Sequence, residues 1–209
     1  MKIKAVIFDM DGVLIDAKDW HYIALNNALE PFGKQISRYD HLVTFDGLPT
    51  RDKLEMISRE SNFPRGLHNF INELKQKFTF EMIATKCKPT FYHQYALSRL
   101  KNEGYKLAVC SNSIRESVRM MMEKAGLLEY LEFFISNQDV TKGKPDPEMY
   151  LTAIKKLNLN PQECLVVEDN ENGIKAAIAS GANLLKVDTV LDVNYFNIVE
   201  RINQIENNA

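Results

Sequence analysis

The sequence predicts an α/β protein with a doubly wound parallel sheet, and three observations support this fold class. Five short, nearly continuous apolar runs rich in β-branched residues are typical of strands that are buried on both faces of a sheet. Helical patterns separate these runs from about residue 89 onward, and this alternation is typical of a parallel sheet covered by helices. The region between the first run and residue 87 carries only helical patterns, which indicates an insertion.

The expected strands and helices follow one another with clear boundaries. Strands are expected at residues 3–8, 105–110, 133–136, 164–168 and 183–187. The helical patterns "TFYHQYALSRLKNEG", "IRESVRMMMEKAG" and "ENGIKAAIASG" end on Gly104, Gly126 and Gly181, because glycine readily adopts the left-handed conformation that closes a helix. The pattern "DPEMYLTAIKKLNLN" carries Pro147 in its first turn, where proline is tolerated. The stretch after residue 190 predicts a last helix and a polar tail.

The helical region after the first strand is too long to be a loop inside a compact sheet domain. It contains the patterns "AKDWHYIALNNALEPFG", "TRDKLEMISRESN" and "PRGLHNFINELKQKFTFEMIATKC". We therefore predict a core domain formed by residues 1–16 and 87–209, and an α-helical cap domain of residues 17–86 inserted after the first strand.

Composition and charge narrow the classes of function. The chain has 209 residues, of which 45% are hydrophobic and 26% are charged, as in ordinary soluble globular proteins. A net charge of −2 without a dense run of lysine and arginine argues against nucleic acid as a partner. Acidic residues follow the amino terminus too closely for a signal-peptide core, and no stretch approaches the roughly 20 apolar residues of a membrane helix. The sequence thus favours a cytoplasmic protein without a membrane partner, and it is compatible with a monomer.

Carboxylates follow two of the expected strands. In "KAVIFDMDGVLID", Asp9 stands at the carboxyl end of the first strand and Asp11 lies two residues later, so both can face the same crevice. In "VVEDNENG", Glu168 and Asp169 close another buried strand. Acidic residues at strand ends can be simple turn formers, but carboxylates that converge on one edge suit a hard cation such as Mg²⁺. The four acids are therefore candidate metal ligands.

Polar groups suited to phosphate follow two further strands. Ser111 and Asn112 end the strand in "AVCSNS", beside the amino terminus of the next helix, and can hold phosphate oxygens. The loop "KGKPDPEMY" offers Lys142 and Lys144, and one such cation can neutralise both carboxylate and phosphate. Taken singly, these residues are equally well explained as helix caps or solvated charges. Complementary groups at four strand ends of one sheet favour a phosphate-handling site.

Four short motifs occur in a fixed order along the chain: "FDMDGVL", "SNS", "GKPDP" and "VVEDNENG". This set resembles the motifs of the haloacid dehalogenase (HAD) superfamily, in its phosphatase and phosphomutase branch with a helical cap. The resemblance covers the whole chain and implies a Rossmann-like core. It also implies that Asp9 is the nucleophile and that Asp11 is the general acid and base.

The same resemblance implies roles for the other core residues. Ser111 and Lys144 would bind the transferring phosphoryl group, and Lys144 rather than Lys142 precedes the proline that the motif requires. The resemblance implies a Mg²⁺ site with these members: Asp9, the backbone carbonyl of Asp11, Asp169, and Glu168 as a ligand or an orienting group.

The expected cap carries weaker matches to the same superfamily. "DAKDWHYIALNNAL" and "DGLPTRDKL" resemble the first cap helix and the specificity loop of β-phosphoglucomutase-like members. The resemblance implies that His21 couples cap closure to acid and base readiness and that Lys77 contacts the substrate. Gly47 would allow a bend in the loop. A structural role is the alternative for His21, because a single histidine in a helical pattern is more often structural.

Three cap positions depart from the mutase pattern. Ala17 stands where mutases usually have threonine, and Thr50 stands where they have a phosphate-gripping arginine, with Arg51 displaced by one position. A mutase needs a second phosphate grip, since its bisphosphate intermediate must be held at either end. These departures favour hydrolysis over mutase activity.

The sequence therefore predicts a Mg²⁺-dependent phosphatase that hydrolyses a small phosphorylated metabolite, with a sugar phosphate as the favoured class. The reaction would pass through an aspartyl-phosphate intermediate. The alternative enzyme is a β-phosphoglucomutase-type sugar phosphomutase. A non-catalytic protein that binds a phosphorylated ligand is disfavoured, because every catalytic group implied by the resemblance is present.

Overall fold

A computed structural model describes residues 2–45 and 47–208 of the chain. Contacts between Cα atoms divide the chain into two compact units, residues 1–16 together with 87–209 and residues 17–86. Within the described residues, the larger unit contains a sheet and the smaller unit contains only helices and their connections. None of the helices in this part of the chain has both the length and the apolar character needed to cross a membrane.

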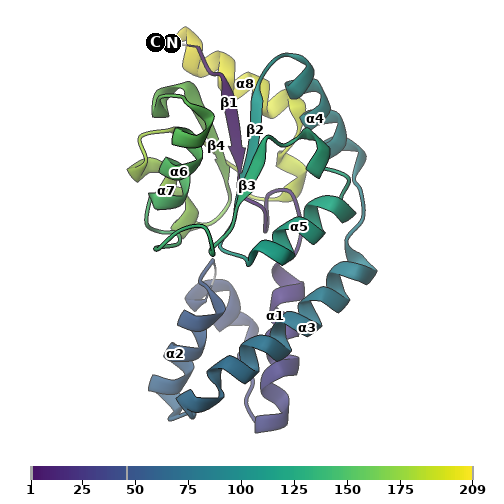
Figure 1. Cartoon of the computed structure of the whole chain (residues 1–209), viewed down its shortest axis with the longest axis vertical. Helices are drawn as coiled ribbons and strands as arrows, with labels where there is room; N and C mark the ends of the chain where they lie inside the picture. The colour runs from purple at the N-terminus through teal and green to yellow at the C-terminus, as the bar shows by residue number, and fades with distance from the viewer. Residues whose placement is uncertain (1, 46, 209) are drawn as a thin grey trace. The chain divides into compact units, whose positions relative to one another are not determined.

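The larger unit contains a five-stranded sheet whose strands all run parallel, which confirms the predicted fold class (Figure 1). The strands are β1 (Ala5–Phe8), β2 (Lys106–Cys110), β3 (Phe133–Ile135), β4 (Cys164–Glu168) and β5 (Asn183–Lys186). They lie in the order β3-β2-β1-β4-β5, so the order reverses beside β1. In open sheets of this kind, ligands bind outside the carboxyl ends of the strands at the point of reversal.

Helices cover both faces of the sheet, as the alternating pattern predicted. Figure 1 shows α6 and α7 on one side of the sheet and α4, α5 and α8 on the other. Their bounds are α4 (Phe91–Asn102), α5 (Arg115–Lys124), α6 (Glu148–Leu157), α7 (Glu171–Ala179) and α8 (Tyr195–Asn207). The side chain of Asn170 accepts a hydrogen bond from Gly173 N at 3.0 Å and caps the start of α7, directly after β4.

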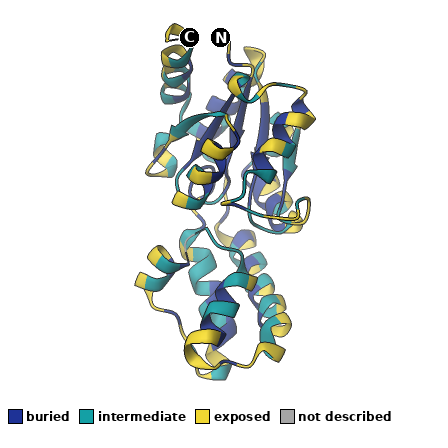
Figure 2. Cartoon of the chain, turned by 90° about the vertical axis from the view of Figure 1, so that its left-hand side faces the viewer, coloured by how far each residue is buried: buried dark blue, intermediate teal, exposed yellow. Residues whose placement is uncertain are grey.

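The register of the sheet brings the ends of three strands together. Phe8 of β1 lies opposite Val109 of β2 and Val167 of β4. All four residues of β1 are 0% exposed, and Figure 2 shows the central strands in the colour of buried residues, in keeping with the burial of β1, β4 and all but the first residue of β2. The residues that follow these strands therefore leave a rigid, buried sheet at one edge, which fixes their positions.

In the smaller unit, the predicted helical patterns form α1 (Lys18–Leu29), α2 (Thr50–Ser61) and α3 (His68–Lys86). Helix α1 packs against α3. An apolar cluster that includes Leu25, Leu54, Phe63 and Ile71 gives this unit a hydrophobic core of its own. Asp46, the first residue of the stretch that resembles a specificity loop, lies outside the described residues.

Candidate active site

Asp9 directly follows β1 and is buried, with only 5% of its surface exposed. Its backbone N–H donates to Val167 O at 3.0 Å, which continues the ladder between β1 and β4. Burial raises the pKa of Asp9 well above its ordinary value, and the nearby carboxylates of Glu168 and Asp169 add to this, whereas the Lys144 ammonium opposes it. Burial and the neighbouring carboxylates thus disfavour the charged form of Asp9, and a cation beside it favours that form.

Lys144 supplies such a cation from the loop before α6. Its side chain is 3% exposed, and its ammonium donates to Asp9 Oδ1 at 2.5 Å, Glu168 Oε1 at 2.6 Å and Cys110 O at 2.9 Å. Burial alone would lower the pKa of Lys144, but the carboxylates of Asp9 and Glu168 outweigh it, so the pKa lies above its ordinary value. The three N–H groups of the ammonium thus have three acceptors, which fixes the charge at the ends of β1, β2 and β4.

Glu168, the last residue of β4, is completely buried and held by several groups. Tyr150 of α6 donates its hydroxyl to Glu168 Oε1 at 2.5 Å. On the other oxygen, Oε2 accepts from Asp169 N at 3.1 Å and from Asn170 Nδ2 at 3.4 Å. A Cβ atom on Gly173 would lie 1.8 Å from Oε1, so α7 can approach this carboxylate only because residue 173 is glycine.

Three carboxylates of this edge form a group that can hold a metal ion. Asp9, Glu168 and Asp169 each offer one oxygen, and these oxygens all lie within 4.8 Å of one another. Hard oxygen ligands of this type suit Mg²⁺, which is usually bound by one or two carboxylates together with water and substrate phosphate. The donor set therefore fits the predicted cofactor. The side chain of Asp11 is not part of this group, and the use of its backbone carbonyl as a ligand stays a prediction.

Asp11 lies in a tight turn after β1. Gly12 N donates to Ile15 O at 2.7 Å, and a φ of +90° at Gly12 explains the glycine at this position. The carboxylate of Asp11 is half-buried and its Oδ2 accepts a hydrogen bond from Ser113 Oγ at 2.9 Å. Ser111 is 1% exposed at the end of β2, and its hydroxyl accepts a hydrogen bond from Ser113 N at 3.0 Å.

The side chain of Asn112 makes two hydrogen bonds to the backbone of Lys144, which the sequence did not predict. Its Nδ2 donates to Lys144 O at 3.1 Å, and its Oδ1 accepts from Lys144 N at 3.0 Å. A Cβ atom on Gly143 would lie 2.6 Å from Asn112 Oδ1, so the glycine of "GKPDP" permits this close approach. Asn112 therefore holds the backbone of the lysine loop, and a contact of Asn112 with phosphate stays a prediction.

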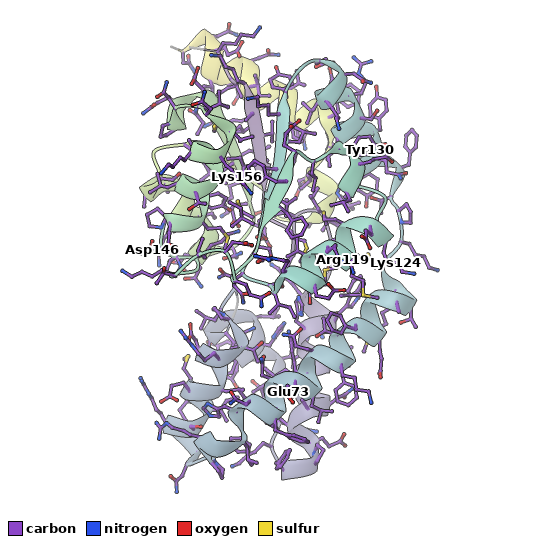
Figure 3. All side chains as sticks on the ribbon, viewed as in Figure 1. Glu73, Arg119, Lys124, Tyr130, Asp146 and Lys156 are labelled. Atoms are coloured by element: carbon purple, nitrogen blue, oxygen red, sulfur yellow. The ribbon has the colours of Figure 1, made fainter. Side chains whose placement is uncertain are left out.

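The same loop is fastened to the helix that follows it. Asp146 Oδ1 accepts a hydrogen bond from Glu148 N at 3.0 Å, and Figure 3 labels Asp146 in the loop that leads into α6. The carboxylate of Glu148 accepts from Thr141 N at 2.8 Å and from Lys142 N at 2.9 Å. Lys142, the weaker candidate of the two lysines, is exposed, whereas Lys144 is buried in the site.

In the smaller unit, the candidate residues differ in their surroundings. His21 lies on α1, and its Nδ1 is 3.3 Å from Lys75 Nζ, so the lysine donates to the imidazole. Lys77 lies on the exposed side of α3. Lys75 instead is 8% exposed and shares a face of α3 with Ile71, because residues four positions apart lie on one side of a helix.

The specificity-loop candidates lie at the start of α2. Gly47 adopts a φ of +67°, which fits the predicted bend. Thr50 is the first residue of α2. The side chain of Arg51 is 88% exposed, and its Nε is 3.2 Å from Asp52 Oδ1. Arg51 therefore points into solvent in the smaller unit, paired with its neighbour in sequence.

Four residues with structural importance for these groups were not singled out from the sequence: Ser113, Tyr150, Gly173 and Lys75. Ser113 lies within the quoted motif "SNS", and Gly173 lies within "VVEDNENG", so both had a positional signal. Tyr150 occupies an apolar position of a helical pattern, where a tyrosine is indistinguishable from core filling. Lys75 could have been found from the spacing of four between Ile71, Lys75 and Thr79 on the buried face of α3.

Comparison with known proteins shows the family of the chain. The chain belongs to the haloacid dehalogenase-like hydrolase family, whose profile matches residues 6–187. A phosphorylated carbohydrates phosphatase from Thermotoga maritima is 30% identical over 182 residues, which cover 86% of this chain and 82% of that protein. A β-phosphoglucomutase from Bacillus subtilis is 27% identical over 186 residues, which cover 86% and 80% of the two chains.

Solved structures support the fold. The crystal structure of a β-phosphoglucomutase from Clostridium difficile matches with a TM-score of 0.84, over 97% of this chain and 98% of that chain, at 24% identity. The family and fold predicted from the four motifs are thus confirmed.

Proposed function

We propose that the protein is a Mg²⁺-dependent phosphomonoester hydrolase that acts through an aspartyl-phosphate intermediate. The observation that carries this proposal is the buried group at the carboxyl ends of β1 and β4, in which Lys144 bridges Asp9 and Glu168 while Asp169 completes a set of three converging carboxylates. A site that places a carboxylate nucleophile beside a fixed cation suits phosphoryl transfer, in which negative charge spreads over the transferring oxygens.

Each proposed role is the one that the family resemblance implies for the residue. Asp9, directed by the ammonium on its Oδ1, would attack phosphorus. Asp11 would give a proton to the leaving oxygen and later take one from the attacking water. Ser111 and Lys144 would bind the transferring phosphoryl group. Mg²⁺ held by Asp9, Asp169 and the backbone carbonyl of Asp11, with Glu168 as a ligand or an orienting group, would supply further positive charge against the phosphoryl oxygens.

The proposed substrate is a small phosphorylated metabolite, with sugar phosphates as the favoured class. The phosphatase from Thermotoga maritima and the mutase from Bacillus subtilis, both named for carbohydrate substrates, support this choice. Hydrolysis is favoured over mutase activity because Thr50 replaces the expected second phosphate grip, and the displaced Arg51 is exposed and paired with Asp52.

We propose that residues 17–86 form the domain that selects the substrate. The candidate residues are His21, Gly47, Thr50, Arg51 and Lys77 from the sequence, together with Lys75 from its contact with His21. In this proposal, differences in these residues change the substrate without changing the chemistry of the buried carboxylates and Lys144. Separating chemistry from selectivity in this way fits a family that contains both phosphatases and mutases.

The experiment that tests the proposal is a screen of the purified protein against phosphorylated metabolites, with Mg²⁺ and with EDTA. The screen includes β-glucose 1-phosphate with and without a bisphosphate activator. Free phosphate that requires Mg²⁺ supports the hydrolase, whereas glucose 6-phosphate formed with little free phosphate would identify a mutase.

The variant Asp9→Asn serves as the site-directed test in the same screen. Turnover should fall below detection while thermal unfolding stays close to that of the wild type. Asp188→Asn is the matched control, because Asp188 also follows a strand of the sheet but is exposed and lies outside the group of three carboxylates. Full activity of Asp9→Asn would contradict the assignment of the nucleophile.

A further inference from the structure

The side chain of Asp11 accepts a hydrogen bond from Ser113, a residue to which the family resemblance assigns no role. The hydroxyl of Ser113 donates a hydrogen bond to Asp11 Oδ2 at 2.9 Å, across 102 positions of sequence. Both side chains are half-buried. The contact joins the turn after β1 to the loop after β2, and therefore links the proposed acid to a different strand of the sheet.

The backbone of Ser113 is fastened on both sides, so its hydroxyl has a defined place. Ser113 N donates to Ser111 Oγ at 3.0 Å, and Ser113 O accepts from Asn137 N at 3.1 Å. Ser111 directly follows β2, and Asn137 lies two residues after the end of β3. A side chain whose backbone is held by two strand ends can orient another group, because the position of its Cα–Cβ bond is restricted.

We propose that Ser113 is a positioning residue whose hydroxyl directs the proton of Asp11 to Oδ1 during phosphoryl transfer; this inference rests on the proposed function. A carboxyl oxygen that accepts a hydrogen bond from a hydroxyl acts as the carbonyl-like oxygen, so the proton of a protonated carboxyl group resides on the other oxygen. Anchoring Oδ2 also limits rotation of the carboxyl group. Oδ1 of Asp11 therefore keeps one direction and carries the proton.

The step can be written with atoms and electrons balanced. Asp9 forms a bond to phosphorus while the bond from phosphorus to the leaving oxygen breaks. The electron pair of the broken bond goes to the leaving oxygen, which takes the proton from Oδ1 of Asp11 and departs as an alcohol. Ser113 keeps its own proton. Its contribution is therefore large for an alkyl ester, whose alkoxide needs a proton, and small for 4-nitrophenyl phosphate, whose phenolate leaves without one.

The test compares kcat/KM for two esters, the sugar phosphate that the wild type hydrolyses fastest and 4-nitrophenyl phosphate. This parameter reports the first transfer to Asp9, where Asp11 acts as the acid. In Ser113→Ala, we expect a loss on the order of 30-fold for the sugar phosphate and about threefold for 4-nitrophenyl phosphate, since general acid catalysis contributes about 10²–10⁴-fold. The kcat/KM for 4-nitrophenyl phosphate divided by the kcat/KM for the sugar phosphate should thus rise about tenfold. Ser113→Thr keeps a hydroxyl and should keep the ratio within about twofold of the wild type.

Ser136→Ala is the matched control. Ser136 follows β3 and donates its hydroxyl to Asp139 Oδ2 at 2.5 Å, so the variant also removes a hydrogen bond between serine and aspartate near the same loop. Its ratio of kcat/KM values should stay at that of the wild type even if its stability falls. A shift in this ratio as large as that of Ser113→Ala would overturn the inference, because any loosening of the loops would then have the same effect.

Equal losses on both esters in Ser113→Ala would also overturn the inference, since they would show a purely structural role. If Ser113→Ala does not fold, Ser113→Cys replaces it, because a thiol is a weak donor of similar shape, and an unchanged ratio would count against the inference. The proposed function fails in a different way: a wild-type protein that hydrolyses neither ester would overturn the function and the inference together.

Discussion

The two units of the chain hold their candidate functional groups in opposite ways. In the larger unit, Lys144 is 3% exposed and its ammonium has acceptors on residues 135, 34 and 24 positions away. In the smaller unit, the side chain of Arg51 is 88% exposed and its ion pair is with the next residue in sequence. The groups proposed for chemistry are fixed by long-range contacts, whereas the groups proposed for selectivity range from buried (Lys75) through half-buried to exposed (Arg51 and Lys77). We infer that substitutions in the larger unit act on turnover and that those in the smaller unit act on substrate choice.

The largest effect is expected for Gly173→Ala. A Cβ atom at this position would lie 1.8 Å from Glu168 Oε1 and 2.0 Å from Cδ, so the carboxylate must move. Alanine favours the helix by about 1 kcal/mol relative to glycine, so loss of α7 is not expected. Because Glu168 holds Lys144 and belongs to the candidate metal site, we expect kcat to fall on the order of 100-fold or more. Steady-state kinetics at saturating Mg²⁺, with circular dichroism as the test of folding, measure this effect.

Gly66→Ala is the matched control from the smaller unit. A Cβ atom there would have no atom within 4 Å, and the residue lacks the positive φ of Gly47. Its kinetics should match those of the wild type. Equal kinetics in Gly173→Ala and Gly66→Ala would show that Glu168 can move without an effect on turnover. This result would contradict the inference that the contacts in the larger unit determine turnover.

The parts of the fold that depend on local pattern were predictable from sequence. The strand at Cys164–Glu168 has the expected bounds. The first strand begins at Ala5 rather than at residue 3, because Ala5 is paired with the first residues of β2 and β4, and no neighbouring strand extends further. Its expected start could not be refined from sequence, since an apolar run does not reveal where the partner strands begin.

The candidate site was predictable only where its residues lie in short motifs. Asp9, Lys144 and Glu168 were identified in this way, and they do converge in the structure. Tyr150 was not identified, because its hydroxyl meets Glu168 through the packing of α6 on the sheet, and its sequence position is that of an apolar helix residue. Ser113 was missed for a related reason, since its partner is 102 positions away.

A smaller effect within the larger unit is expected for Tyr150→Phe. The aromatic ring would still fill its buried position, but Glu168 would lose the hydroxyl that lies 2.5 Å from Oε1. A hydrogen bond to a charged group contributes about 1.5–3 kcal/mol. Part of this loss should appear in kcat, because the ammonium of Lys144 shares the same oxygen, and we expect a decrease of roughly tenfold with KM nearly unchanged.

Tyr130→Phe removes a hydroxyl from the same unit outside the candidate site (Figure 3). Its kcat should equal that of the wild type. If Tyr150→Phe lowers only the unfolding temperature and leaves kcat unchanged, Tyr150 stabilises the fold without positioning Lys144.

The contrast between the units can be sharpened on one helix, α3. Lys75 is buried beside His21 and Lys77 is exposed, although the resemblance assigned the substrate contact to Lys77. Methionine keeps most of the length of either side chain and removes only the charge. We expect Lys75→Met to raise KM for the sugar phosphate roughly fivefold, equivalent to about 1 kcal/mol of binding. Lys77→Met should change KM less than about twofold, because an exposed charge on a long side chain contributes little.

Measured kcat and KM for both variants decide between the two lysines. A larger increase in KM for Lys77→Met would restore the assignment from the resemblance and would make Lys75 a structural residue. A decrease in kcat with unchanged KM for Lys75→Met would contradict the assignment of selectivity to the smaller unit.

The mildest effect concerns pH and stability, and it involves a buried histidine in each unit. Burial, assisted by the positive charge of Lys53, lowers the pKa of His41 to about 4, while the hydrogen bond from its Nε2 to Lys18 O opposes this shift. Burial also lowers the pKa of His93, whose Nε2 donates to Val190 O at 2.9 Å. Both imidazoles are therefore neutral in the folded protein at pH values where they are charged in the unfolded chain.

The sign of the pH dependence follows from proton linkage. Between an unfolded pKa of about 6.5 and the folded pKa of about 4, unfolding takes up a proton at His41, so the free energy of unfolding falls as pH falls through this window. Denaturant unfolding of His41→Gln, measured from pH 7.5 to pH 4, should show a shallower decline than that of the wild type. His93→Gln should also make the free energy of unfolding depend less on pH. If the two units unfold in separate transitions, His41→Gln should affect the transition of the smaller unit and His93→Gln that of the larger unit. If the slope of His41→Gln equals that of the wild type, the imidazole of His41 in the wild type is already in contact with water in the folded protein. Water would then reach the interior of the smaller unit more easily than the interior of the larger unit.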